Sequence, residues 1–220
     1  MLENFNKELK KIKENIKEIA KGLYKANEII LEAVKSCDDK NFEDAKSYVQ
    51  NVTKKSDKID NKIVKLLALY APEARDLREV VAYLKISNEL LRASASTRSF
   101  IRRFMDICSS VDIKVINEYA LPLQSSTVKA LKLMSDMLDK ECIDELQDIY
   151  NEILIEENKT DDLYEILEKY ILKNTTIQSN FEDIHKMLKA FRKSEKIADR
   201  SISIANLLVY IKVGGNIGSV

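Results

Sequence analysis

The scarcity of glycine and proline constrains the fold of this chain more than any other feature of its sequence. The 220 residues include only four glycines and two prolines, and the glycines at 214, 215 and 218 lie in the last seven positions. Tight turns and hairpins depend on such residues for their special backbone angles. A chain with so few of them is poorly suited to many short strands, so the sequence predicts long helices.

Apolar residues recur at helical spacing along the first half of the chain. One stripe predicts a helix from Leu2 to about Ser36, and it consists of Phe5, Leu9, Ile12, Ile16, Ile19 and Leu23. A second helix is expected to begin at Asn41 as its N-cap and to end at Ala71–Pro72. A third then runs from about Glu73 to Ser109.

The same pattern starts again at residues 110–112. We expect a fourth helix over 112–138 with a kink at Pro122, and a fifth over 143–172. A sixth is capped by Asn174–Thr175 and ends at Gly214–Gly215. Long helices joined by short turns pack antiparallel. The sequence therefore predicts an all-α protein of two tandem antiparallel three-helix bundles, residues 1–111 and 112–220.

Charge and cysteine usage narrow the class of protein. The 36 basic and 36 acidic residues cancel, so no overall positive field favours nucleic acid. The N-terminus lacks the apolar segment of a signal peptide, and no stretch approaches the roughly 18 apolar residues of a membrane span, which indicates a cytoplasmic protein. The three cysteines, Cys37, Cys108 and Cys142, are far apart, and we expect buried or free thiols in a reducing compartment.

One carboxylate interrupts the apolar seam of the sixth helix, and a second follows it on the same side. That seam comprises Ile184, Leu188, Phe191, Glu195, Ala198, Ile202, Ala205 and Val209. Glu195 stands where burial is expected, and Asp199 follows one turn later on the same side. A buried carboxylate without a partner is costly, so this pair calls for a cation, a basic side chain or water. The predicted seam of the third helix comprises Leu77, Val81, Leu84, Asn88, Leu91 and Ala95, which aligns Leu91 with Glu195 and Ala95 with Asp199.

Several segments resemble the PhoU family of phosphate-uptake regulators. The stretch Pro72–Arg78 (PEARDLR), the preceding Leu66–Leu69 (LLAL) and Lys85–Leu90 (KISNEL) look like the central signature of that family. The segment Glu195–Asp199 (EKIAD) is similar to its second acidic motif, and Asn206 and Tyr210 lie beyond it. The resemblance covers most of the chain as two tandem three-helix repeats.

The resemblance implies metal binding at the acidic motifs, but only the second repeat keeps one. Leu91, Ala95 and Ser96 replace the first motif, and Arg200 stands where the family usually has histidine. Glu157 and Asp161 on the fifth helix are candidate partners of Glu195 and Asp199. These four carboxylates would offer hard oxygen ligands to a divalent or iron-type metal ion. The alternative is that nearby cations neutralise the acids as ordinary salt bridges, and the candidates are Arg200, Lys196 and Lys159.

A second group of residues has a candidate role in partner binding. Asp76 and Arg78 either complement helix ends or contact a partner. The patch of Arg98, Arg102 and Arg103 is either a solvated face or a docking site for an acidic partner or lipid head groups.

We expect no catalysis from this chain. Its single histidine, His185, cannot supply the paired Glu-x-x-His motifs of a di-metal enzyme, and no glycine-rich phosphate loop is present.

The resemblance implies a cytoplasmic adaptor that links the ATPase of a phosphate transporter to a sensor histidine kinase and limits uptake when phosphate is plentiful. Membrane association would then occur only through partners, and a homodimer stays open. The alternative is a divergent PhoU-like metal-binding or structural protein that serves a different transporter.

Overall fold

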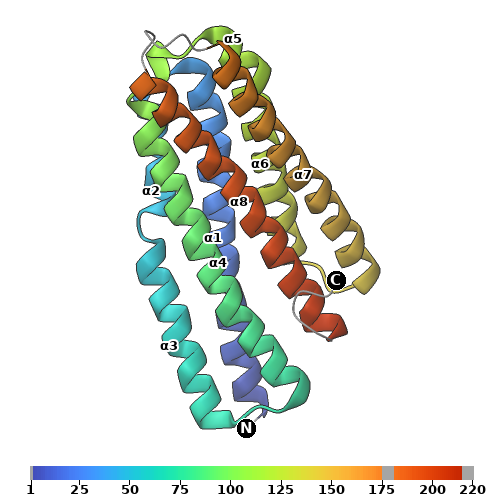
Figure 1. Cartoon of the computed structure of the whole chain (residues 1–220). Coiled ribbons are helices and arrows are strands. Elements are labelled where there is room, and N and C mark those ends of the chain that lie inside the picture. Colours follow the sequence, from blue (N-terminus) through green and yellow to red (C-terminus); the bar gives the residue numbers. More distant parts are fainter. Residues whose placement is uncertain (1, 175–180, 215–220) are drawn as a thin grey trace.

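The protein is a bundle of long helices, seen in a computed structural model that describes residues 2–174 and 181–214. The first half contains α1 (Leu2–Ser36), α2 (Asp39–Val49), α3 (Val52–Tyr70) and α4 (Ala74–Met105). The second half contains α5 (Ile113–Val115), α6 (Leu121–Met137), α7 (Ile143–Asn174) and α8 (Phe181–Val213). No strand occurs in these described ranges, and the long helices run alongside one another (Figure 1). The all-α fold of two three-helix units is confirmed, while the exact domain limits at 111 and 112 stay a prediction.

The helices α1 and α8 follow the sequence pattern closely. All six residues of the α1 stripe are buried. At the other end of the chain, Gly214 adopts a left-handed conformation with φ of 81°, and its N–H donates to the carbonyl of Tyr210 at 2.9 Å. Gly214 is therefore the predicted C-terminal stop of α8. Asn174, predicted to cap the sixth helix, is instead the last residue of α7, while Thr175 and Gly215 lie outside the described residues.

The prediction of the second helix was wrong in two respects: the helix begins earlier than expected, and it is two helices rather than one. Asp38, not Asn41, is the N-cap, because its extended backbone lets its carboxylate accept from the N–H of Lys40 at 3.0 Å. The helix also breaks at residues 50–51, which separates α2 from α3. Arg98 on α4 donates to the carbonyl of Val49 at 2.7 Å and so satisfies one of the carbonyls that the break leaves free.

The predicted fourth helix contains a π-helical turn just before Pro122, and the predicted kink at this proline stays a prediction. A 3-10 turn (Cys108–Ser110) follows α4, and a π-helical turn (Ile116–Ala120) separates α5 from α6. Pro122 is the second residue of α6, which directly follows this π-helical turn. Local widening of the helix thus occurs just ahead of the proline.

The seam predicted for α4 was wrong by about one residue. Leu77, Leu84, Asn88 and Ala95 are exposed, whereas the neighbouring positions Val80, Tyr83, Ser87, Leu90, Ser94 and Thr97 are buried. The buried face includes hydroxyl side chains, which sequence patterns assign to solvent. Hydrogen-bond partners make the burial of two of them tolerable: Ser87 and Ser56 lie 2.8 Å apart through their hydroxyl oxygens, and Thr97 donates to the carbonyl of Ala93 at 3.1 Å.

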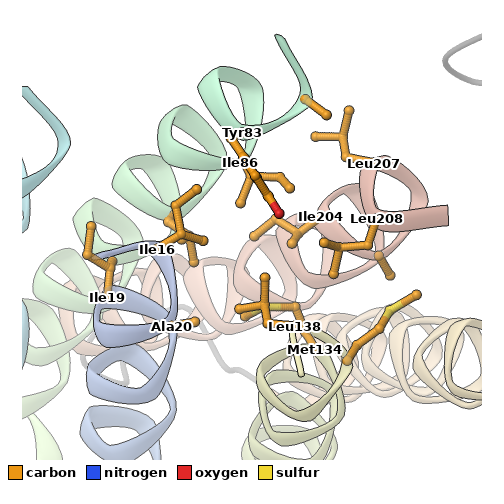
Figure 2. Close-up of a cluster of buried hydrophobic side chains, with 14 of the residues drawn as sticks. Ile16, Ile19, Ala20, Tyr83, Ile86, Met134, Leu138, Ile204, Leu207 and Leu208 are labelled. Atoms are coloured by element: carbon orange, nitrogen blue, oxygen red, sulfur yellow. The ribbon is translucent and has the colours of Figure 1, made fainter. Parts of the chain in front are cut away.

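The two halves of the chain share their hydrophobic core. The most extensive helix–helix contact joins α4 of the first half to α8 of the second. Figure 2 shows side chains from four helices converging in one cluster, among them Ile16 of α1, Ile86 of α4, Met134 of α6 and Ile204 of α8. A second cluster, with Phe42, Phe100, Phe104 and Phe191, also draws on both halves. The repeats therefore pack as one body along α1, α4, α6 and α8.

A buried polar network crosses the interface between the halves. Ser194 on α8 donates to Gln124 on α6 at 2.6 Å, and the Gln124 amide lies 3.4 Å from Asn27 on α1. Asn27 donates in turn to Thr97 on α4 at 3.2 Å. All four side chains are at most 1% exposed. Because buried polar groups need partners, this chain of bonds fixes how the four helices are aligned.

The expectation of three buried or free thiols was wrong for two of the cysteines. Cys37 and Cys108 form a disulfide with their Cα atoms 5.6 Å apart, whereas Cys142 is free and exposed. The spacing of 71 residues gave no hint of this pair, because the turns after α1 and α4 meet only in the folded chain. None of the helices among the described residues is both long and apolar enough to span a membrane.

Candidate functional site

Three carboxylates from α7 and α8 meet where these neighbouring helices pack. Glu157 and Asp161 lie one turn apart on α7, and Asp199 faces them from α8. One oxygen of each carboxylate lies within 4.8 Å of the others. Among the described residues this is the one place where three or more potential metal-ligating side chains of this kind come together. We call these residues, with Glu195, the acidic site.

Glu195 is the most unusual member of the acidic site. It is 3% exposed, and its Oε2 atom is buried without a hydrogen-bond partner. Its Oε1 atom lies 2.9 Å from Arg192 and 3.7 Å from Lys196. Burial, followed by the nearby charge of Asp199, raises the pKa of Glu195 to about 7. Half of this carboxylate is thus unsatisfied, and its negative charge is unfavourable in the folded chain.

The same causes act on Glu157. Its pKa is raised by burial first and then by the charges of Asp161 and Asp199. Two carboxyl groups of the acidic site therefore hold their protons more tightly than a free glutamate. Perturbed carboxyl groups on facing helices are typical of a functional site.

Local cations neutralise the acidic site only in part. Of the three cations considered from sequence, Lys196 lies 3.1 Å from Asp199. The other two pair elsewhere: Arg200 with Glu89 at 3.0 Å, and Lys159 with Glu156 at 2.8 Å.

Sequence reasoning missed Arg192, the closest cation to Glu195. The signal was available, since Arg192 precedes Glu195 by three residues and such pairs share a helix face. Arg192 also lies over the ring of Tyr164, 5.2 Å from its centre. Four carboxylates are therefore matched by two nearby cations, Arg192 and Lys196.

The donor set of the acidic site fits a hard metal cation. Carboxylate oxygens are the ligands that Ca²⁺, Mg²⁺ and Mn²⁺ prefer. Glu157, Asp161 and Asp199 would hold the ion, and the free oxygen of Glu195 supplies a further acceptor nearby. Such an ion would neutralise the excess charge and tie α7 to α8. In the first repeat, Leu91 is partly buried and Ala95 is exposed, so the aligned positions offer no carboxylate pair.

The residues predicted to bind partners have largely intramolecular contacts. Asp76 lies in the first turn of α4, where its charge complements the helix dipole. Arg78 lies over the ring of Tyr210, 5.8 Å from its centre, and packs beside Gly214 at the end of α8.

The three arginines of the basic patch differ in whether they are bound within the chain. As described above, Arg98 is bound to the end of α2. Arg103 donates to the hydroxyl of Ser99 at 3.3 Å, whereas Arg102 is exposed. Arg102 is thus the member of the patch with the greatest freedom to meet another molecule.

Comparison with known proteins finds a match to one domain family in the first half of the chain. Residues 8–103, somewhat less than half of the chain, match the family model described as the PhoU domain. A curated relative, the phosphate-specific transport system accessory protein PhoU homolog 1 of Methanothermobacter thermautotrophicus, is 21% identical over 94% of this chain and 93% of its own length.

Solved structures of PhoU proteins share the fold along nearly the whole chain. The crystal structure of PhoU from Pseudomonas aeruginosa matches with a TM-score of 0.84 at 19% identity, covering 96% of this chain and 100% of that one. The phosphate transport system regulatory protein PhoU from Streptococcus pneumoniae matches with a TM-score of 0.72 at 19% identity, covering 96% and 98%. These likenesses confirm the PhoU-type six-helix architecture.

Proposed function

We propose that this protein is a PhoU-type, cytoplasmic, non-catalytic adaptor that limits phosphate uptake through contacts with a transporter ATPase, a sensor histidine kinase, or both. The observation that carries the proposal is the PhoU domain, together with a curated relative of nearly equal length that is named as an accessory protein of phosphate-specific transport. Long helices joined by short turns present the extended rigid faces that such adaptor work requires.

Arg102 is the residue best placed to test the partner surface. It is exposed on the last turns of α4, so its reversal to glutamate should weaken docking on an acidic partner without affecting the fold. Lys10, exposed near the start of α1, provides a matched charge-reversal control. We expect Arg102→Glu, and not Lys10→Glu, to reduce recovery of the partner.

The experiment is a cross-linked purification of the tagged chain from its native cells, grown at high and at low phosphate. We expect a phosphate-transporter ATPase or a sensor kinase to be recovered specifically, in an amount that changes with phosphate. Recovery of neither component at either phosphate level would contradict the adaptor function. Light scattering of the same purified protein will show whether it is a homodimer.

A second candidate activity is metal binding at the acidic site. The buried and unpartnered oxygen of Glu195 beside three clustered carboxylates favours it. Asp199→Asn should weaken binding, whereas Glu165→Gln changes an exposed carboxylate on α7 and serves as the control. We expect the purified chain to contain a metal, and Mn²⁺ or Mg²⁺ to raise the Tm of the wild type and of the control more than that of Asp199→Asn. Absence of metal by elemental analysis, together with no rise in Tm, would refute the site.

The loss of the first acidic motif favours one alternative function. Leu91 and Ala95 stand at the positions aligned with Glu195 and Asp199, so the chain has diverged from the two-motif pattern. It would then serve a transporter for a different anion. Uptake measured with phosphate and with sulfate in cells with and without the chain separates the two functions, because only the uptake of the regulated anion should change.

A further inference from the structure

The junction between the repeats carries a cross-link that the proposed adaptor function does not use. Cys37 lies in the turn after α1, and Cys108 lies in the 3-10 turn after α4. Their disulfide closes a loop that contains α2, α3 and α4. It therefore ties together two turns that precede the second repeat, at one end of the molecule.

The surroundings of the two sulfur atoms differ. Cys108 is 3% exposed and belongs to the core cluster that contains Phe42, Phe104 and Ile116. Cys37 packs against the same cluster but is only partly buried. An attacking thiol would therefore reach the sulfur of Cys37 more readily than that of Cys108.

The backbone at Cys37 gives a second, independent observation. Its φ of 51° lies in the left-handed region, and its N–H donates to the carbonyl of Ala33 at 2.8 Å as the last turn of α1 ends. Glycine or asparagine usually occupies this position, because other side chains are disfavoured there. The cross-link is one of the contacts that fix Cys37 in this disfavoured conformation, so opening the bond would remove one restraint on the turn.

The junction is also connected to α8. The hydroxyl of Ser110 lies 3.2 Å from the carboxylate of Asp183 in the first turn of α8. Ile107 and Cys108 pack in the same cluster as Phe191. A change in the turn that contains Cys108 would therefore reach the beginning of the helix that carries Glu195 and Asp199.

We propose that the Cys37–Cys108 disulfide is a redox-sensitive staple that controls how tightly the junction of the repeats is held. A dithiol reductant opens it by exchange: one thiolate attacks the sulfur of Cys37, and Cys108 leaves as a thiolate. The second thiol of the reductant then releases Cys37. Two electrons and two protons pass to the cysteine pair, and the reductant becomes a disulfide. In the proposed cytoplasmic setting, such bonds are typically transient or redox-sensing.

The test uses the full chain with Cys142→Ser, which removes the exposed thiol and prevents its exchange with the pair. Alkylation under denaturing conditions, followed by mass spectrometry, reports the free thiols before and after dithiothreitol. We expect none at Cys37 and Cys108 before reduction and two after it. We also expect reduction to lower the Tm by about 10 °C. Hydrogen exchange should accelerate at residues 34–42 and 104–116, with residues 52–66 as an internal control.

Two further variants separate the bond from unspecific effects of the reductant. Cys37→Gly suits the left-handed backbone, and Cys108→Ala keeps the core site apolar. In each, the Tm should not respond to dithiothreitol. Two free thiols in the oxidised preparation, or an unchanged Tm and unchanged exchange on reduction, would overturn the proposal. The comparison of the same chain before and after reduction decides the matter even where a variant fails to fold.

Discussion

Replacing Glu195 with glutamine should stabilise the protein at alkaline pH in the absence of metal. The pKa of Glu195 is raised from 4.5 to about 7, so the folded chain binds this proton more tightly than the unfolded chain. The stability due to the protonated group is fully present below about pH 4.5 and is lost as the pH rises through 7. The difference, at about 1.4 kcal/mol for each tenfold change in proton affinity, is roughly 3 kcal/mol.

The substitution also has an opposing effect. Glutamine loses the ion pairs with Arg192 and Lys196, whose side chains are 48% and 38% exposed, and such pairs together contribute about 1 kcal/mol. We therefore expect Glu195→Gln to gain about 2 kcal/mol at pH 8, which corresponds to a Tm higher by roughly 4 to 8 °C. At pH 4.5 the variant and the wild type should differ little.

The assay is thermal unfolding of both proteins in a chelator at pH 4.5 and at pH 8. Glu165→Gln is the matched control, because its carboxylate is exposed and its pair with Lys169 lies on the surface of α7. It should change stability by less than about 0.5 kcal/mol at either pH. A Glu195→Gln protein that is less stable than the wild type at pH 8, or whose difference from it does not vary with pH, would refute this account of the buried charge.

Three other substitutions test the packing. Gly214→Ala should destabilise the protein by about 1 to 3 kcal/mol in urea unfolding, because φ is 81° and a Cβ atom would lie 2.6 Å from Nη1 of Arg78; an unchanged midpoint would contradict that contact. Phe191→Ala should cost about 3 to 5 kcal/mol, since it is fully buried between the aromatic rings of α4, and a loss below 1 kcal/mol would show that the two halves do not share this core. Gln124→Leu should cost about 1 to 3 kcal/mol by leaving its buried partners unpaired, and a gain in stability would argue against the network.

The fold was predictable where one face of a helix is clearly apolar. The stripe from Phe5 to Leu23 on α1 is one such face, and the seam of α8 around Phe191 and Ala198 is another. On α4 the same reasoning failed, because α1, α3 and α8 all cover this helix. Its buried face accepts Ser87 and Thr97, whose hydroxyls find partners that only the folded chain provides.

The acidic site was predictable in its composition and not in its charge balance. The spacing of Glu195 and Asp199 on an apolar seam pointed to the α8 half of the site, and the stripe on α7 pointed to Glu157. The pairing of Arg200 with Glu89 depends on how α4 packs against α8, which no local pattern encodes. The disulfide depends in the same way on two turns that are remote in sequence.

The most direct test of the proposed function is the initial rate of phosphate uptake by the native cells grown in high phosphate, with the chain deleted and then restored. The account predicts faster uptake in the deletion strain and a return to the slower rate when the chain is supplied again. Equal uptake rates in the two strains would contradict a role in limiting phosphate transport.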